Sequence, residues 1–555
     1  RSAHVDRAIQ SDARSCGVGA GVARSRCDSA EGIGIEVNEV ERAIVTAVID
    51  NRVRVKLAEL RAVLVTPEQR RALCAEFEHV NTQYAKSRAL GFFPKGEPTI
   101  KTWSKDAEHI TFPRGGLACL RRHVMQAHGR LELADRQVNG HAAILPKFKR
   151  SLWPHQARAL PIMLLAKSGI VRAPTGSGKT SLGIAFASAA KVPAIVIVWT
   201  QGLFDQWAER IASDLGIHPG QVGKIGGGMR RLSPITVAMQ QTLASRRIDP
   251  MIREYFGTLI YDEVQKAPAQ TCYDVVDQFP ARRRIGLSAD HSRKDKMECL
   301  SHDLFGDVIV DIPSREVQAA GHTVAVEVRI VPTDFEAPWY RNGGMSFSVP
   351  AEASFDNPQW GSTVDDAPQK PGDWNALLVA MSKDERRNDL VVDLVRETGV
   401  KSMQALVLSL RREHCEHILG LLRAGGTSEK RSGLLLGGEE SSEEFDRVLA
   451  GIRDGSIRIG VGTVQAIGTG TDLPTVEAAI IAAPIAGNRQ LFGQVLGRVG
   501  RSAPGKKSAC VYVLTDTNVF GTEHVRNIAK WYDHVTVRTR AGDWIPVRDY
   551  LQRPA

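Results

Sequence analysis

The feature that most constrains this chain is a glycine-rich loop placed between an apolar strand and a helix. An apolar run at 168–171 precedes the loop and a small-residue run at 181–186 follows it. The loop, called the phosphate loop below, reads Ala173-Pro174-Thr175-Gly176-Ser177-Gly178-Lys179-Thr180. This spacing matches G-x-x-x-x-G-K-[ST], with alanine in place of the first glycine. Backbone N–H groups and the positive end of the following helix surround phosphate oxygens in such loops. The sequence therefore predicts an α/β nucleotide-binding domain, with Lys179 on the β- and γ-phosphates of ATP and Thr180 on Mg²⁺.

The length of 555 residues predicts several domains. A hydrophobic content of 43% and a charged content of 24% are typical of a soluble globular protein. The net charge of +10 favours a polyanionic partner. Eight cysteines without a C-x-x-C pair favour reduced thiols over a zinc ribbon or a disulfide framework. The sequence contains no apolar run near ~18 residues, so we expect no membrane association and a cytoplasmic location.

Apolar strands alternate with helical segments twice along the chain, which is typical of parallel, doubly wound sheets. Before them, 53–57 alternates like a strand, 67–84 and 117–127 look helical, and 131–149 looks like a connector. We therefore predict two tandem α/β domains behind a small mixed α+β domain. The predicted divisions are a flexible arm at 1–32, an accessory domain with its connector at 33–150, the ATP-binding domain at 151–332, a linker or insertion at 333–375, and a second α/β domain at 376–555.

Two adjacent carboxylates follow the apolar strand 258–261. Ligands of open α/β sheets bind at the carboxyl ends of the strands, which is where Asp262 and Glu263 are predicted to lie. We expect Asp262 to hold Mg²⁺ opposite Thr180, and Glu263 to orient and deprotonate the attacking water. An Asp-Glu pair after a strand is often only a turn, but its place downstream of the phosphate loop favours the catalytic interpretation.

With the phosphate loop, seven further segments resemble, in order, the motifs of superfamily 2 helicases: 153–156, 199–207, 237–243, 262–265, 286–290, 461–474 and 494–501. The resemblance implies two RecA-like domains with ATP in the cleft between them. It implies ATP contacts for Gln156, Pro174, Thr175, Gly176, Ser177, Gly178, Lys179, Thr180, Ser181, Gly470 and Asp472. It implies nucleic-acid contacts for Thr200, Gln201, Gln241, Thr242 and Thr463, and a coupling role for Ser288, Ala289 and Asp290.

The segment 494–501, called the arginine segment below, has a physical logic of its own. If it is helical, Gln494, Arg498 and Arg501 share one face at i, i+4 and i+7. Two guanidiniums aimed at a γ-phosphate from the opposite domain would neutralise transition-state charge as arginine fingers do. We therefore expect these three residues to complete a catalytic set with Lys179, Asp262 and Glu263. A solvated basic helix is the alternative, and Gly497 and Gly500 argue against it.

Three positions depart from the helicase pattern: Asp290 replaces a threonine, Gln265 replaces a histidine or aspartate, and Trp199 stands where a proline is common. Asp290 leaves open how ATP hydrolysis is coupled to strand movement. The segment 279–288 most resembles the DNA-repair and restriction-type branch, and 290–306 resembles phage-encoded helicases of that branch. Other candidate nucleic-acid contacts are the cations of 282–284 and the aromatics Trp339 and Tyr340. For these the alternatives are a solvated face and a loop anchor.

The prediction is an ATP-dependent helicase or translocase that uses ATP and Mg²⁺ and acts on single-stranded or branched DNA, with RNA as a second possible substrate, in a bacterial or phage-infected cell. Two alternatives stay open. One is the ATPase motor subunit of a restriction or defence complex, with protein partners that cut DNA. The other is a nucleic-acid clamp that uses ATP only as a switch, against which Glu263 argues because it supplies a hydrolytic base.

Overall fold

The computed structural model describes residues 43–89, 93, 96–140, 142–143, 145–245, 248–264, 270–289, 298–321, 323–341, 373–436, 442–468, 473–485, 489–532 and 534–552. The predicted arm at 1–32, most of the predicted insertion at 333–375, and the predicted site residues Gly470, Asp472 and Asp290 lie outside these ranges. Among the described helices, none is long and apolar enough to cross a membrane.

The accessory domain is built on a five-stranded sheet of order β5-β6-β2-β1-β7. Its strands are β1 (Ile44–Ile49), β2 (Arg52–Lys56), β5 (Ser104–Lys105), β6 (His109–Pro113) and β7 (Arg130–Asp135), and its helices include α1 (Leu57–Val63), α2 (Pro67–Ala75) and α4 (Leu117–Gln126). Alternate residues of β2 are buried, and Val53 and Val55 join Phe112, Leu120 and Val124 in one core. This confirms the alternation expected at 53–57.

Two secondary-structure predictions in this domain are wrong. The helix expected over 67–84 ends at Ala75, because the buried Phe77 turns into the core and its carbonyl accepts a 3.1 Å hydrogen bond from the Thr102 amide. The chain then forms β3 (Glu78–Val80), paired with β4 (Thr99–Lys101), and α3 (Thr82–Ala89). The connector expected at 131–149 begins instead with β7, which pairs with β1 in parallel.

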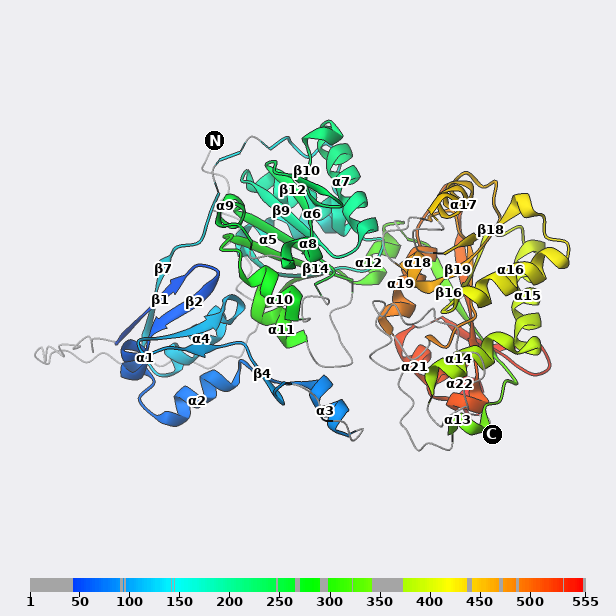
Figure 1. Cartoon of the computed structure of the whole chain (residues 1–555), viewed down its shortest axis with the longest axis horizontal. Coiled ribbons are helices and arrows are strands. Elements are labelled where there is room, and N and C mark those ends of the chain that lie inside the picture. The colour runs from blue at the N-terminus through cyan, green and yellow to red at the C-terminus, as the bar shows by residue number, and fades with distance from the viewer. Residues whose placement is uncertain are drawn as a thin grey trace, which may run out of the picture. The chain divides into compact units, whose positions relative to one another are not determined.

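The first α/β domain has an eight-stranded sheet of order β11-β10-β12-β9-β13-β14-β8-β15, with helices on both faces (Figure 1). Its strands are β8 (Ser168–Arg172), β9 (Ala194–Val198), β10 (Gly223–Gly226), β11 (Met229–Arg231), β12 (Ile235–Met239), β13 (Thr258–Asp262), β14 (Arg283–Ser288) and β15 (Val308–Asp311). All neighbours pair in parallel except the edge hairpin β10–β11. Parallel strands buried on both faces explain why these runs are almost purely apolar.

The second α/β domain has a sheet of order β18-β19-β17-β20-β21-β16-β22-β23. Its strands are β16 (Ala325–Pro332), β17 (Ala405–Ser409), β18 (Ser432–Leu435), β19 (Ile459–Thr463), β20 (Ala478–Ile481), β21 (Ser508–Thr515), β22 (Val535–Arg538) and β23 (Trp544–Pro546). The sequence boundary at residue 332 assigns β16 to the first domain. Eight paired positions with β21 place this strand in the second sheet instead. The fold class is the predicted one, two tandem RecA-like α/β domains, each with one antiparallel edge pair.

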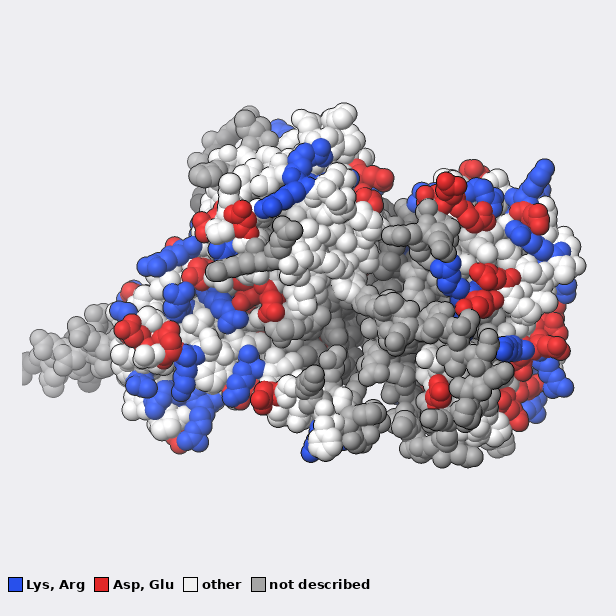
Figure 2. Space-filling model, viewed as in Figure 1, with Lys and Arg blue, Asp and Glu red and all other residues white. Residues whose placement is uncertain are grey.

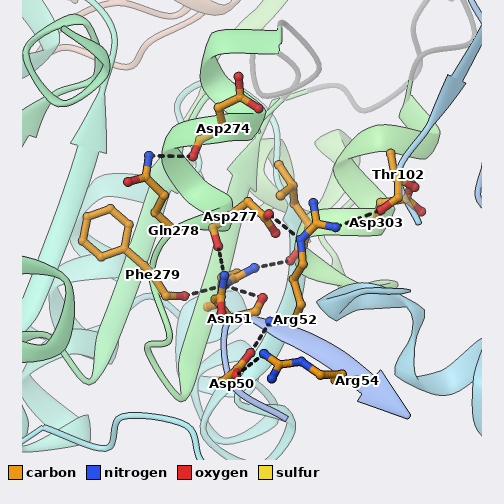
Figure 3. Close-up of polar contacts among 12 residues, drawn as sticks. Asp50, Asn51, Arg52, Arg54, Thr102, Asp274, Asp277, Gln278, Phe279 and Asp303 are labelled. Atoms are coloured by element: carbon orange, nitrogen blue, oxygen red, sulfur yellow. Dashed lines mark hydrogen bonds and ion pairs between the residues drawn. The ribbon is translucent and has the colours of Figure 1, made fainter. Parts of the chain in front are cut away.

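A buried polar network joins the accessory domain to the first α/β domain (Figure 3). Arg52 on β2 forms a 2.7 Å ion pair with Asp277, which ends α10 (Gln270–Asp277). Thr102 donates to Asp303 on α11 (Glu298–Phe305) at 2.5 Å. Arg284 is fully buried and donates to the carbonyls of Phe279, Leu304 and Asn51. Arg284 is therefore neither a solvated cation nor a nucleic-acid contact, because its guanidinium is consumed by backbone carbonyls.

The aromatic pair Trp339 and Tyr340 anchors a loop, as the second interpretation predicted. Both residues belong to α13 (Pro338–Arg341) and are half-buried against a cluster that includes Trp374, Leu377 and Phe520. The ring centroids of Tyr340 and Phe520 lie 6.4 Å apart in an edge-on arrangement. This packing gives the two rings a structural role in holding the loop.

Candidate active site

The phosphate loop connects β8 to α6 (Lys179–Ala190), as the spacing predicted. Gly178 caps α6 in the left-handed conformation at φ +75°, and a Cβ there would lie 2.3 Å from Nε2 of Gln156. Only glycine satisfies both conditions. The buried Gln156, on α5 (Pro154–Ala166), donates to the carbonyls of Ser177 and Gly178 at 3.1 Å each. Gln156 therefore braces the phosphate loop from behind.

Negatively and positively charged side chains both influence Lys179. Its Nζ donates to the Ala173 carbonyl at 3.0 Å. Burial lowers the pKa of the Lys179 ammonium, Glu263 and Asp262 oppose that effect, and Arg501 and Arg498 add to it. The structure thus brings together the lysine, both carboxylates and both arginines that the sequence selected. An ammonium among these groups can neutralise a polyphosphate.

Asp262 ends β13 and is held by two donors. Trp207 Nε1 donates to Oδ2 at 2.8 Å, and the Glu263 amide donates to Oδ1 at 3.0 Å. Burial raises the pKa of the Asp262 carboxyl, and the charge of Glu263 raises it further. Glu263 itself has φ +60°, a region that non-glycine residues seldom occupy. Backbone strain of this kind gathers at functional sites.

The arginine segment is helical only in part. α19 (Arg489–Val499) carries Gln494 and Arg498, but it ends before Arg501, which forms a bridge with Thr323 instead. The prediction that all three share one helical face is therefore wrong for Arg501, because Gly500 follows the last helical residue. The positive charge of Arg501 nevertheless contributes to lowering the pKa of Lys179. Gly497 faces the phosphate loop so closely that a Cβ there would lie 2.3 Å from Cβ of Thr175.

A cavity of about 610 Å³ adjoins the phosphate loop and α19, and neither Lys179 nor the two carboxylates line it. It is lined from the phosphate loop by Pro174 and Thr175 and from α19 by Gln494 and Gly497. Ala289 lines it as well, and the preceding Ser288 accepts a 2.9 Å hydrogen bond from the Ala173 amide. Two of the predicted coupling residues thus adjoin the phosphate loop.

The hydroxyl groups of two other predicted ATP ligands, Ser181 and Ser177, differ in their hydrogen bonding. The Ser181 hydroxyl donates to Asp214 at 2.8 Å and accepts from Arg210 at 2.7 Å. The Ser177 hydroxyl is buried and, among the described residues, has no hydrogen-bond partner. Thr175, Gly176 and Thr180 are half-buried along the same loop. The Ser177 hydroxyl thus has free hydrogen-bonding capacity within the phosphate loop, whereas that of Ser181 is committed to the protein.

The predicted nucleic-acid residues divide by exposure. Gln201, Gln241 and Thr242 are exposed, whereas Thr463 is buried. Thr200 caps α7 (Gln201–Leu215) by accepting from the Leu203 amide at 3.4 Å. Thr463 likewise accepts from the Ala466 amide at 3.3 Å, at the start of α18 (Val464–Gly468). The hydroxyls of Thr200 and Thr463 therefore position helix ends. Gln201 and Gln241 are exposed but donate to Asp205 Oδ2 at 2.9 Å and to the Trp199 carbonyl at 2.7 Å.

Sequence reasoning missed the residues that hold the site from behind. Trp207 on α7 touches Asp262, and Tyr261 on β13 reaches Gln240 at the start of α8 (Gln240–Ala244). A signal for Trp207 was present, because it lies on the apolar stripe of α7 together with Leu203, Phe204 and Ile211. Its indole N–H within such a stripe needs a buried acceptor.

Two family models match the chain in the order of these domains. Residues 131–293 match the family described as "Type III restriction enzyme, res subunit", and residues 386–503 match the "Helicase conserved C-terminal domain". The chain belongs to superfamily 2 of the helicases, in the DNA-repair and restriction-type branch. Members of this superfamily use ATP, usually with Mg²⁺, and act on nucleic acids.

Individual relatives agree with this assignment. The chain is 25% identical over 383 residues to a "DNA 3'-5' helicase XPB" of Kineococcus radiotolerans, covering 67% of this chain and 61% of the relative. It is 32% identical over 179 residues to a "DNA 3'-5' translocase XPB2" of Sulfurisphaera tokodaii, covering 32% and 40%. It is 25% identical over 346 residues to a "Probable helicase D10" of Escherichia phage T5, covering 62% and 67%. The chain thus spans less than two thirds of the XPB relative's length.

Proposed function

We propose that this helicase hydrolyses ATP with Mg²⁺ and uses the energy to translocate on, or remodel, DNA. The observation that carries the proposal is the close approach of α19 to the phosphate loop, where a Cβ at Gly497 would lie 2.3 Å from Cβ of Thr175. The charges of Asp262 and Glu263 from one domain and of Arg498 and Arg501 from the other both act on Lys179. Lysine, two carboxylates and arginines contributed from the opposite domain are the groups that phosphoryl transfer to water needs.

The residues fit the substrate and the metal. The backbone of the phosphate loop and Lys179 would bind the phosphates, and Glu263 would orient water and accept its proton. Arg498 and Arg501 would neutralise charge that develops on the γ-phosphate. Thr180 and Asp262 offer the oxygen ligands that Mg²⁺ prefers, so they would hold the metal. Bound there, Mg²⁺ would help to neutralise the negative charge of the phosphates.

DNA is the proposed substrate because the named relatives are DNA helicases and translocases. The exposed Gln201, Gln241 and Thr242 would contact the phosphate backbone, which gives binding without sequence preference. Figure 2 shows Lys and Arg interleaved with Asp and Glu on the face it presents. The net charge of +10 supports attraction to a polyanion such as DNA. The mixed charges on the face shown in Figure 2 do not define a DNA-binding surface.

The test is the ATPase rate of the protein alone, with single-stranded DNA, with forked duplex DNA and with RNA, each at two salt concentrations. We expect stimulation by DNA that weakens at higher salt, because phosphate contacts release counterions. Lys179→Ala and Glu263→Gln should abolish turnover and leave DNA binding in place. Turnover that ignores every nucleic acid would overturn the proposal of an autonomous motor.

A second candidate is the motor subunit of a restriction complex. The match of residues 131–293 to a restriction res-subunit model favours it. In that case a partner protein would be needed for full DNA stimulation, and the partner would cut the DNA. Co-purification with a nuclease or methyltransferase that restores DNA-stimulated turnover would distinguish this candidate from the first.

A further inference from the structure

A small buried polar cluster lies directly behind Asp262. It consists of Tyr261 on β13, Gln240 at the start of α8 and Cys272 on α10, whose side chains are almost completely buried. The Tyr261 hydroxyl donates to Gln240 Oε1 at 3.3 Å and lies 3.2 Å from the Cys272 sulfur. The Cys272 thiol donates to the same Oε1 at 2.8 Å. One amide oxygen thus ties a strand to two helices.

The cluster stands between the two parts of the proposed site. On one side, Tyr261 immediately precedes Asp262 on β13, so a displacement of the backbone at Asp262 would also displace Tyr261. On the other side, Gln240 immediately precedes Gln241, which is exposed and whose Nε2 donates to the Trp199 carbonyl at 2.7 Å. Trp199 adjoins Thr200, the cap of α7. A short chain of contacts therefore runs from the nucleotide side of β13 to both helices that would face DNA.

Burying the polar atoms of this cluster costs free energy that an apolar core would not incur. Tyr261 is surrounded by the apolar side chains of its core, and a phenylalanine there would fill almost the same volume without a polar atom to satisfy. Three polar groups have been buried together where an apolar core would suffice. Buried hydrogen bonds impose one geometry on their elements more strictly than apolar packing does.

We propose that the Tyr261–Gln240–Cys272 cluster couples the nucleotide site to the DNA contacts of α8, with Tyr261 as a positioning residue. The inference rests on the proposed function, because it needs both ATP and DNA to bind. Nucleotide binding at the phosphate loop shifts the end of β13 at Asp262, and the cluster passes that shift to the first turn of α8. Coupling of this kind changes the affinity for one ligand when the other is bound, and it does so reciprocally.

The experiment measures DNA affinity of the full chain with and without a non-hydrolysable ATP analogue and Mg²⁺, using a fluorescent single-stranded oligonucleotide. The ratio of the two dissociation constants is the coupling ratio. In Tyr261→Phe we expect this ratio to move about fivefold or more towards one, while DNA affinity without nucleotide stays within about twofold of wild type.

Tyr273→Phe is the matched control. Tyr273 neighbours Cys272 on α10, is also buried, and its hydroxyl has no hydrogen-bond partner among the described residues. Removing this hydroxyl should leave the coupling ratio at the wild-type value. Cys272→Ala, which removes the thiol donor, should reproduce the effect of Tyr261→Phe and serves as the test if that variant does not fold.

Two outcomes overturn the inference alone. They are a wild-type coupling ratio of one, and a Tyr261→Phe ratio within twofold of wild type, each in a protein whose ATPase is stimulated by DNA. A wild-type protein that hydrolyses no ATP or binds no DNA would overturn the proposed function and the inference together. Loss of coupling in Tyr261→Phe with Tyr273→Phe unchanged supports both.

Discussion

The indole Nε1 of Trp207 donates a 2.8 Å hydrogen bond to Oδ2 of Asp262, and the same ring packs beneath α6. A Cβ on Gly183 of α6 would lie 2.9 Å from the far edge of this indole. One side chain on α7 therefore touches both the proposed metal ligand and the helix that carries the phosphate loop. Its position makes the orientation of Asp262 depend on the packing of two helices.

Trp207→Phe should lower kcat for ATP hydrolysis about tenfold. A hydrogen bond to a charged group contributes about 1.5–3 kcal/mol, and about 1.4 kcal/mol corresponds to a factor of ten. Asp262 would lose its hydrogen bond from the Trp207 indole and would no longer be held towards the metal position. Steady-state ATPase assays across a Mg²⁺ titration measure the effect, and we expect the half-saturating Mg²⁺ concentration to rise.

Phe204→Leu controls for the loss of core volume in this experiment. Phe204 lies on the same helix and is equally buried, but it donates no hydrogen bond. It should cost stability without changing the Mg²⁺ dependence. If both variants lose turnover to the same extent, packing of α7 rather than the Trp207 hydrogen bond holds Asp262.

The accessory domain is predicted to depend on Arg52 much more than on Arg54, although both lie on β2. Arg52 pairs with Asp277 at 2.7 Å across the domain junction, with side chains 25% and 13% exposed. Arg54 pairs with Asp50 at 3.3 Å, with side chains 45% and 24% exposed. Breaking the first pair leaves a carboxylate in a poorly solvated place, which costs about 1–2 kcal/mol, whereas an exposed pair contributes about 0.5 kcal/mol.

Native-state hydrogen exchange of the β2 amides tests this pair of variants. Arg52→Met should raise the frequency of β2 opening about tenfold, and Arg54→Met should change it about twofold or less. Figure 3 shows both arginines in the network. Equal effects would mean that the contact with Asp277 does not hold the junction.

The stability of the same junction should fall as pH rises. Burial alone would lower the pKa of His79, but its 2.7 Å hydrogen bond with Asp303, the charge of Asp303 and the influence of Cys299 together outweigh burial and raise the pKa to about 10. The unfolded chain titrates near 6.5. Because the pKa of His79 is higher in the folded than in the unfolded chain, its protonation stabilises the folded state fully below about pH 6.5. This stabilisation is lost as the pH approaches 10.

The measurement is the difference in melting temperature between wild type and His79→Gln at the same pH. We expect wild type to be more stable at pH 6.5 and the difference to shrink steadily up to pH 10. His109→Gln is the control, since that ring lies 3.8 Å from the largely exposed Asp106. A His79→Gln difference that is constant across this range would show that the His79–Asp303 pair does not depend on protonation.

The parts of this structure that follow local rules were predictable from the sequence. The phosphate loop and the strand before Asp262 were found because spacing and apolar runs determine them within a few residues. Arg501 was misplaced because the end of α19 is set by Gly500 and by the bridge from Thr323, which is remote in sequence. The helix expected over 67–84 failed because the strand that pairs with β3 lies beyond it.

Long-range burial explains the other differences. Arg284 belongs to a run of three arginines, which is typical of a solvated face, and its burial depends on carbonyls of Asn51, Phe279 and Leu304. β16 could not be assigned to the second sheet from its own residues, because its partner β21 begins at Ser508. Tertiary partners of this kind override local patterns, and they also hide residues such as Trp207.

Two glycines of α19 offer a test of how closely the arginine segment must approach the phosphate loop. A Cβ at Gly497 would lie 2.3 Å from Cβ of Thr175, whereas a Cβ at Gly493 would meet its nearest neighbour, the Tyr532 hydroxyl, at 3.5 Å. Glycine to alanine within a helix stabilises by about 0.5–1 kcal/mol, so neither variant should unfold the domain. Gly497→Ala should nevertheless lower kcat at least tenfold, because Arg498 is held away from the γ-phosphate position. Gly493→Ala should keep wild-type turnover, and steady-state ATPase assays on both compare them directly. Wild-type kcat in Gly497→Ala would mean that the contact between Gly497 and Thr175 is not used during catalysis.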